Sequence, residues 1–144
     1  MTSPNRVLRV ACLLLPAMLI ALAGCSKSDP VEPIAWESDY ESAVEKGDKP
    51  LMIDFTASWC GYCRKMDAEV YTDATVVNLS KHFRCVKVDG DKRKDLVARY
   101  HVRGYPTIIF ADAQGEERHR VVGYKNANAF IADMERALQA TGGD

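Results

Sequence analysis

The sequence lacks a large excess of charge of either sign. Its 19 lysine and arginine residues nearly balance its 20 aspartate and glutamate residues, and the formal net charge is −1 at pH 7. A protein that binds nucleic acid usually shows a strongly positive balance, so this composition argues against nucleic acid or an acidic ligand as a partner. Internal repeats and low-complexity segments are also missing, which excludes solenoid and linker-like architectures.

The sequence has only three histidines, and its five cysteines are too few for a disulfide-rich scaffold of 144 residues. The histidines at positions 82, 101 and 119 show no spacing that would complete a zinc site with a cysteine pair. Five cysteines with separate roles cannot form the dense disulfide network that stabilises many small secreted domains. We therefore predict that the protein has no metal and no cofactor other than a disulfide of its own.

The sequence has no apolar run long enough for a comfortable membrane span, which needs about 20 residues. Residues 10–23 are almost uninterrupted in their apolar character, follow Arg6 and Arg9, and run into Leu-Ala-Gly-Cys at residues 22–25. This order resembles the lipobox of bacterial lipoproteins, which implies cleavage after residue 24 and lipidation of Cys25. An ordinary secretory signal or an uncleaved anchor are the alternatives.

The rest of the chain has the length of one domain with one hydrophobic core. We assign residues 1–24 to a signal peptide, 25–34 to a lipidated cysteine and flexible tether, and 35–144 to the domain. The hydrophobic patterns predict a helix over 36–45, a strand over 51–57, helices over 61–71 and 74–82, a strand over 83–88, a helix over 92–100, strands over 107–111 and 118–122, and a final helix from Asn126 or Asn128 to about residue 140. This order predicts an α/β fold with a central mixed sheet flanked by helices.

The most informative segment is Trp-Cys-Gly-Tyr-Cys at residues 59–63, directly after the predicted strand. Cysteines three positions apart at the start of a helix lie one turn from each other and can close and reopen a disulfide. The helix N-terminus favours negative charge and should lower the pKa of the first thiol. We therefore expect Cys60 to be the more exposed cysteine and the nucleophile, and Cys63 to resolve the mixed disulfide. A structural disulfide or half of a zinc site are the alternatives.

The chain resembles the thioredoxin fold over roughly residues 35–140. Residues 54–60 read Asp-Phe-Thr-Ala-Ser-Trp-Cys, and Gly-Tyr-Pro-Thr follows at residues 104–107. The first of these segments, with Tyr-Thr-Asp at residues 71–73, looks most like the C-terminal periplasmic domain of the electron-relay protein DsbD and small exported thioredoxin-like lipoproteins. The resemblance implies disulfide exchange but not a substrate or a direction.

The resemblance also implies roles for residues around the cysteine pair. Asp54 would be the buried acid behind Cys63 that takes up its proton, with a pKa raised by burial. Pro106 would follow a cis peptide bond and leave the Tyr105 backbone open to a substrate strand, and Trp59 would pack beside the pair and shield it. The alternatives are an aspartate at a strand edge paired with a surface lysine, a plain turn proline and an ordinary core aromatic residue.

Cys85 departs from the family pattern, because many thioredoxins carry near this position a lysine that contacts the buried aspartate. Cys85 itself is typical of a small buried apolar residue, with a third redox cysteine as the alternative. Lys87 is on the same face of the strand. The sequence therefore leaves open which residue sets the pKa of Asp54.

Together these features predict a membrane-anchored thiol–disulfide oxidoreductase that faces the periplasm of a bacterial envelope. Tyr62 supplies no cation between the cysteines, which favours a reductase or isomerase over a disulfide-forming oxidase. A reductase outside the cytoplasm needs a membrane electron donor as well as disulfide-bearing client proteins. We expect a monomer. The alternatives are an oxidase and a non-enzymatic module that binds a partner or a copper ion through Cys60 and Cys63.

Overall fold

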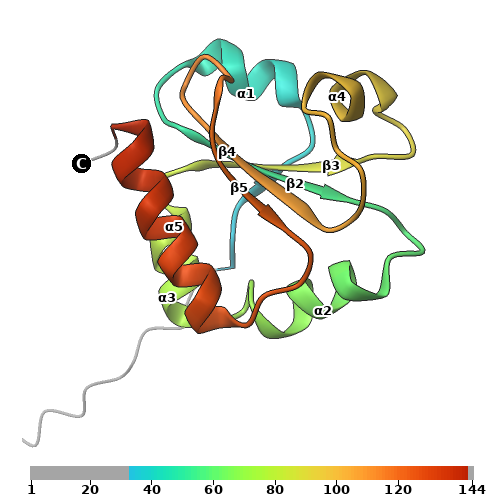
Figure 1. Cartoon of the computed structure of the whole chain (residues 1–144). Coiled ribbons are helices and arrows are strands. Elements are labelled where there is room, and N and C mark those ends of the chain that lie inside the picture. Colours follow the sequence, from blue (N-terminus) through green and yellow to red (C-terminus); the bar gives the residue numbers. More distant parts are fainter. Residues whose placement is uncertain (1–32, 143–144) are drawn as a thin grey trace, which may run out of the picture.

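The computed structural model describes residues 33–142, which form a five-stranded sheet with helices on both faces (Figure 1). The predicted signal peptide, Cys25 and most of the predicted tether lie outside the described residues. The elements follow one another as β1 (Trp36–Glu37), α1 (Tyr40–Lys46), β2 (Leu51–Thr56), α2 (Gly61–Glu69), α3 (Ala74–Ser80), β3 (Arg84–Asp89), α4 (Lys94–Arg99), β4 (Thr107–Ala111), β5 (Glu117–Val122) and α5 (Ala127–Thr141).

The sheet has the strand order β1-β3-β2-β4-β5. Strands β1, β3 and β2 run parallel, whereas β4 is antiparallel to β2 and β5 is antiparallel to β4. The prediction of a mixed central sheet is confirmed. Strand β2 occupies the middle of the sheet, and the loop after it carries the chain directly into α2.

The predicted helix over 36–45 is wrong in its first part. Trp36 and Glu37 form strand β1, which pairs with Cys85 and Val86 of β3. The helix begins only at Tyr40, because the Asp39 side chain accepts a hydrogen bond from the Ser42 backbone N–H and caps it. Spacing within the sequence could not reveal this boundary, since the bonding partner of β1 lies almost fifty residues away.

The predicted starts of two later helices, α3 and α5, are confirmed by their caps. The Asp73 side chain accepts from the backbone N–H groups of Thr75 and Val76 and so begins α3. Asn126 accepts from the Ala129 N–H and begins α5, which leaves Asn128 inside the helix. Each cap satisfies backbone donors that have no partner within their own helix.

No helix within residues 33–142 combines the length and apolar character needed to cross a membrane.

The two faces of the sheet are covered by different helices, with α1 and α4 on one side and α2, α3 and α5 on the other (Figure 1). Side chains alternate along β2, as they must in a strand. Leu51, Ile53 and Phe55 pack into the core beneath α1 and α4, while Met52 packs with Met66 of α2. The alternation therefore directs Asp54 to the same side of the sheet as α2.

Candidate active site

A disulfide between Cys60 and Cys63 lies at the N-terminus of α2, with a Cα–Cα distance of 5.3 Å. Cys60 caps the helix, and its Sγ accepts a hydrogen bond from the Cys63 backbone N–H at 3.1 Å. The same N–H remains available to a Cys60 thiolate after reduction, and it points at one of the two sulfur atoms only. The pair therefore has the polarity expected of a nucleophile followed by a resolving cysteine.

Exposure does not separate the two cysteines as the sequence predicts. Each is only 4% exposed in the disulfide form. The loop before them is held tightly, because the Cys60 N–H donates to the Ala57 carbonyl and the Arg64 guanidinium donates to the Ser58 carbonyl. The difference between the sulfurs in this state is thus one of hydrogen bonding rather than of access.

The segment Gly104–Thr107 lies beside the disulfide although it is some forty residues away in sequence. The Tyr105–Pro106 peptide bond is cis, which confirms the prediction for Pro106. The partly buried Tyr105 side chain packs against Ala57, Cys60 and Cys63. Backbone bonding fixes this segment further, since the Gly123 N–H donates to the Pro106 carbonyl at 2.8 Å.

Trp59 directly precedes Cys60 and is 66% exposed. Its ring stands edge-on to Tyr105 with the ring centroids 5.7 Å apart, and its Nε1–H donates to Asp91 Oδ2 at 2.8 Å. This hydrogen bond, followed by one from Lys94, lowers the pKa of Asp91. Trp59 is therefore an oriented surface group that directly precedes Cys60, and its shielding of the pair stays a prediction.

Gly90 makes room for Tyr105. A Cβ atom at position 90 would lie 2.0 Å from the Tyr105 hydroxyl oxygen, so any larger residue would displace this ring. Sequence reasoning missed this role, as it missed that of Asp91. The Asp-Gly pair at the end of β3 indicates only a turn, and nothing local shows which side chain lies over that turn.

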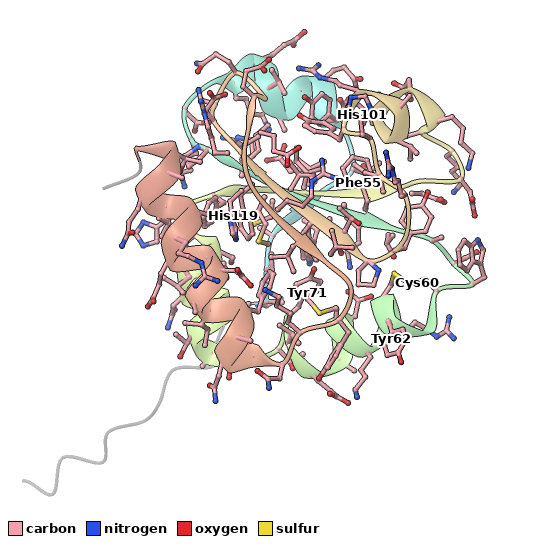
Figure 2. The ribbon with its side chains drawn as sticks, viewed as in Figure 1. Phe55, Cys60, Tyr62, Tyr71, His101 and His119 are labelled. Carbon is pink, nitrogen blue, oxygen red and sulfur yellow. A yellow bond between two sulfur atoms is a disulfide. The ribbon has the colours of Figure 1, made fainter. Side chains whose placement is uncertain are left out.

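A second exposed aromatic residue, Tyr62, lies between the two cysteines in the chain and is 64% exposed; Figure 2 shows it close to Cys60 on α2. Its ring lies 6.2 Å from that of Tyr124, whose hydroxyl donates to Glu69 on α2. Two exposed aromatic rings are thus carried by residues next to the cysteines in the chain, Trp59 and Tyr62. Such a surface is suited to contact with another protein.

Asp54 is a buried carboxylic acid with only 2% of its surface exposed. Burial raises the pKa of Asp54 to about 6. The positive charge of Lys87 lowers this pKa, and the negative charge of Asp67 raises it again. Because β2 is a central strand, the alternative of an aspartate at a strand edge is wrong. A carboxyl group that titrates near neutral pH can both accept and release a proton under ordinary conditions.

Lys87, to which the sequence assigned no role, is the lysine that contacts Asp54. It lies directly opposite Asp54 in the β2–β3 register, and its Nζ is 3.6 Å from Asp54 Oδ2. The same ammonium group forms an ion pair with Asp67. Asp67 is one helical turn beyond Cys63 on α2. Because Lys87 contacts both Asp54 and Asp67, Asp54 lies under the first turns of this helix.

Solvent reaches this side of the pair through a surface cavity of about 240 Å³ whose lining includes Cys63, Asp67 and Asp89.

Cys85 lies elsewhere, on β3 opposite Met52, and burial raises the pKa of its thiol to about 12. A thiol with this pKa is not a nucleophile at neutral pH. The structure therefore favours the packing role of Cys85 over that of a third redox cysteine.

Comparison with known proteins agrees with this geometry. The sequence matches the thioredoxin family over residues 32–136. The chain belongs to the thioredoxin family. Family membership and the Cys60–Cys63 pair together place it among the thioredoxin-like thiol–disulfide oxidoreductases.

The similar proteins include DsbD, a thiol:disulfide interchange protein. DsbD of Ralstonia nicotianae is 38% identical over 109 residues, which cover 70% of this chain and 18% of that protein. DsbD of Pectobacterium atrosepticum is 32% identical over 110 residues, which cover 72% of this chain and 19% of that protein. The thioredoxin-family chain thus spans less than a fifth of the length of these relatives.

Among solved structures, the C-terminal domain of Neisseria meningitidis DsbD in its oxidised form shares the fold. Its TM-score is 0.61 at 24% identity, and the match covers 72% of this chain and 99% of that domain. Within residues 33–142, no cluster of three or more histidine, cysteine, aspartate or glutamate side chains is arranged to hold a metal ion.

Proposed function

We propose that this thioredoxin-family protein reduces or isomerises disulfide bonds of client proteins in a bacterial cell envelope. The observation that carries the proposal is the Cys60–Cys63 disulfide at the start of α2, on the same side of the sheet as a buried acid with a pKa of about 6. A purely structural disulfide would need neither the helix N-terminus nor a titrating carboxyl group behind it.

The reaction begins with the reduced pair. The Cys60 thiolate attacks one sulfur of a client disulfide, the client S–S bond breaks, and the second client sulfur leaves as a thiolate that takes up a proton. A mixed disulfide between Cys60 and the client remains. The Cys63 N–H, which donates to Cys60 Sγ in the structure, stabilises the attacking thiolate before this step.

The second step releases the client. Cys63 passes its proton to Asp54, and the resulting thiolate attacks Cys60 Sγ, so that the mixed disulfide breaks and the second client thiolate leaves. Two electrons have then moved from the pair to the client. Asp54 suits this role because it is largely ionised at pH 7 yet still basic enough to accept a proton.

Clients would bind across the surface formed by Trp59, Tyr62 and the Tyr105–Pro106 segment. The exposed rings of Trp59 and Tyr62 offer apolar contacts next to the cysteines. The backbone at Tyr105 is the group that would pair with an extended client segment, since the Tyr105 side chain packs against both cysteines and so holds this segment beside them. The two electrons would be restored by a membrane electron donor, as the similarity to part of DsbD suggests.

The reduction potential of the Cys60–Cys63 pair tests the direction of electron flow. We expect a value near that of thioredoxin, about −270 mV, because no cationic residue lies between the cysteines to stabilise the reduced state. The measurement is equilibration of the full-length protein, in detergent, against defined ratios of reduced and oxidised thiol buffers. A value near −120 mV, typical of DsbA, would make the protein an oxidase instead.

The envelope location is tested by replacing the proposed lipidated residue, Cys25→Ala. We expect the variant to be lost from the membrane fraction of a bacterial host or to accumulate unprocessed, because no acyl chain can be attached. Cys12→Ala is the matched control, since it removes a cysteine of the predicted signal peptide and should leave membrane attachment unchanged. Full retention on membranes of a Cys25→Ala protein that is processed to the wild-type length would contradict a lipid anchor.

A further inference from the structure

The two oxygens of Asp54 have different surroundings. Oδ2 faces the Lys87 ammonium group at 3.6 Å. Oδ1 is buried and has no hydrogen-bond partner among residues 33–142. A buried carboxylate oxygen without a partner is costly, so a donor that serves Oδ1 would control how readily Asp54 ionises.

One other side-chain oxygen within residues 33–142 is buried without a hydrogen-bond partner, and it belongs to Tyr71. Tyr71 and Asp54 share the neighbour Lys87, whose Nζ lies 3.6 Å from Asp54 Oδ2 and 5.3 Å from the centroid of the Tyr71 ring. Burial raises the pKa of Asp54 to about 6 and the Tyr71 hydroxyl acts in the opposite direction, while burial followed by the charge of Asp54 raises the pKa of Tyr71 well above its usual value. Tyr71 therefore keeps its proton and remains a hydrogen-bond donor close to the Asp54 carboxyl group.

The packing of Tyr71 leaves its hydroxyl little freedom. The residue follows the C-terminal end of α2, where its backbone N–H donates to the Met66 carbonyl. Its ring is 5% exposed and packs against Trp36 of β1 and Phe130 of α5, with centroid distances of 5.0 Å and 5.8 Å. Figure 2 shows Tyr71 on the same side of the sheet as Cys60, inside the layer formed with α2 and α5.

Tyr71 also helps to hold the cation at the other oxygen. Lys87 Nζ lies 4.7 Å from the Trp36 ring centroid and 5.3 Å from that of Tyr71. An ammonium group over aromatic faces is stabilised by their negative quadrupoles. The rings of Trp36 and Tyr71 thus contact the Lys87 ammonium group and hold it between Asp54 and Asp67.

We propose that Tyr71 is a positioning residue for Asp54, whose hydroxyl donates to Oδ1 of the ionised carboxylate while its ring fixes Lys87 at Oδ2. The inference rests on the proposed function, because it matters only if Asp54 takes up the Cys63 proton. In that step the proton moves from Cys63 to Asp54, and Tyr71 neither gains nor loses one. The charged groups facing Asp54 are Lys87 of β3 and Asp67 of α2, with Cys85 of β3 a weaker neighbour of Tyr71.

The test is Tyr71→Phe, which removes the hydroxyl and retains the ring. The Asp54 side-chain carboxyl carbon is titrated by ¹³C NMR in the disulfide form of the full-length protein, where neither active-site cysteine titrates. We expect the Asp54 midpoint to rise by about one pH unit, because a hydrogen bond to the charged form is lost. The pH profile of client release from the mixed disulfide should move upward with it.

Tyr100→Phe is the matched control. It removes another buried hydroxyl, which bonds to Tyr40 and the Gly115 carbonyl beneath the opposite helices, and it should leave the Asp54 midpoint unchanged. An unchanged or lowered midpoint in Tyr71→Phe would overturn the proposal. So would a shift of the release profile that persists in an Asp54→Asn background, because the effect would then not pass through Asp54.

If Tyr71→Phe does not fold, a fluorinated tyrosine introduced at position 71 alone retains the shape of the side chain. Its phenol is more acidic and donates more strongly, so the Asp54 midpoint should fall, and no change would overturn the proposal. These outcomes are separate from failure of the proposed function. A wild-type protein without exchange activity would defeat that function, whereas an unmoved Asp54 midpoint defeats only the role of Tyr71.

Discussion

Cys60→Ser is expected to lower the rate of disulfide exchange by about three orders of magnitude or more, because a serine hydroxyl cannot form the mixed disulfide. Cys63→Ser should have a different result. Its Cys60 can still attack, but nothing resolves the product, so each molecule should remain covalently joined to one client. The measurement is reduction of a disulfide-bonded client, with non-reducing gel electrophoresis to detect the covalent complex.

Cys85→Ala is the control for this pair of variants. Cys85 is a buried thiol on β3 whose pKa is raised to about 12, so its loss should affect packing but not exchange. If Cys63→Ser instead lost all complex formation and Cys60→Ser trapped clients, the roles of the two cysteines would be reversed. The hydrogen bond from the Cys63 N–H to Cys60 Sγ would then not mark the nucleophile.

Asp54→Asn is expected to stabilise the folded protein at pH 8 by about 3 kcal/mol, because burial raises the pKa of Asp54 from 3.8 to about 6. A raised pKa means that the folded state binds the proton more tightly than the unfolded state. The stability that Asp54 contributes is therefore present below pH 4 and is lost as the pH rises through 6. Urea unfolding of the disulfide form at pH 4 and pH 8 should show the gain for the variant only at the higher pH.

The same substitution should slow the release of client from the mixed disulfide by about 10²-fold at neutral pH, because the proton acceptor for Cys63 is gone. A gain in stability together with a loss of activity would indicate a group kept for its chemistry at the expense of the fold. Release at the wild-type rate would make Asp54 a structural residue.

Asp133→Asn provides a control of opposite sign. Asp133 on α5 is also buried, at 1% exposure. Burial opposes its ionisation, but hydrogen bonds from Lys125, Arg136 and His119 outweigh this and lower its pKa to about 2. Its contribution to stability is present above pH 4 and lost as the pH falls towards 2, so Asp133→Asn should destabilise the protein at neutral pH and leave exchange unchanged.

The sequence by itself determined the features that depend on local order. A strand followed by Cys60 and Cys63 at a helix start, an aspartate within an apolar strand, and a proline after Gly104 and Tyr105 are all legible without a structure. The caps at Asp73 and Asn126 are equally local, since each side chain bonds to N–H groups two or three residues ahead. Local backbone geometry requires certain residue types at regular spacing, so it can be recognised in a single sequence.

Only the tertiary structure decided the partners that surround these residues. Tyr71 and Lys87 meet Asp54 from other elements, and Asp91 reaches Trp59 from the far end of β3. The two-residue strand β1 exists because β3 supplies its hydrogen bonds, and without that partner the same residues also fit a helix. Packing joins positions that are 17 to 49 residues apart, and a single sequence carries no periodic record of such pairs. The identity of the reactive pair is therefore local, whereas the pKa of the acid behind it is a property of the assembled fold.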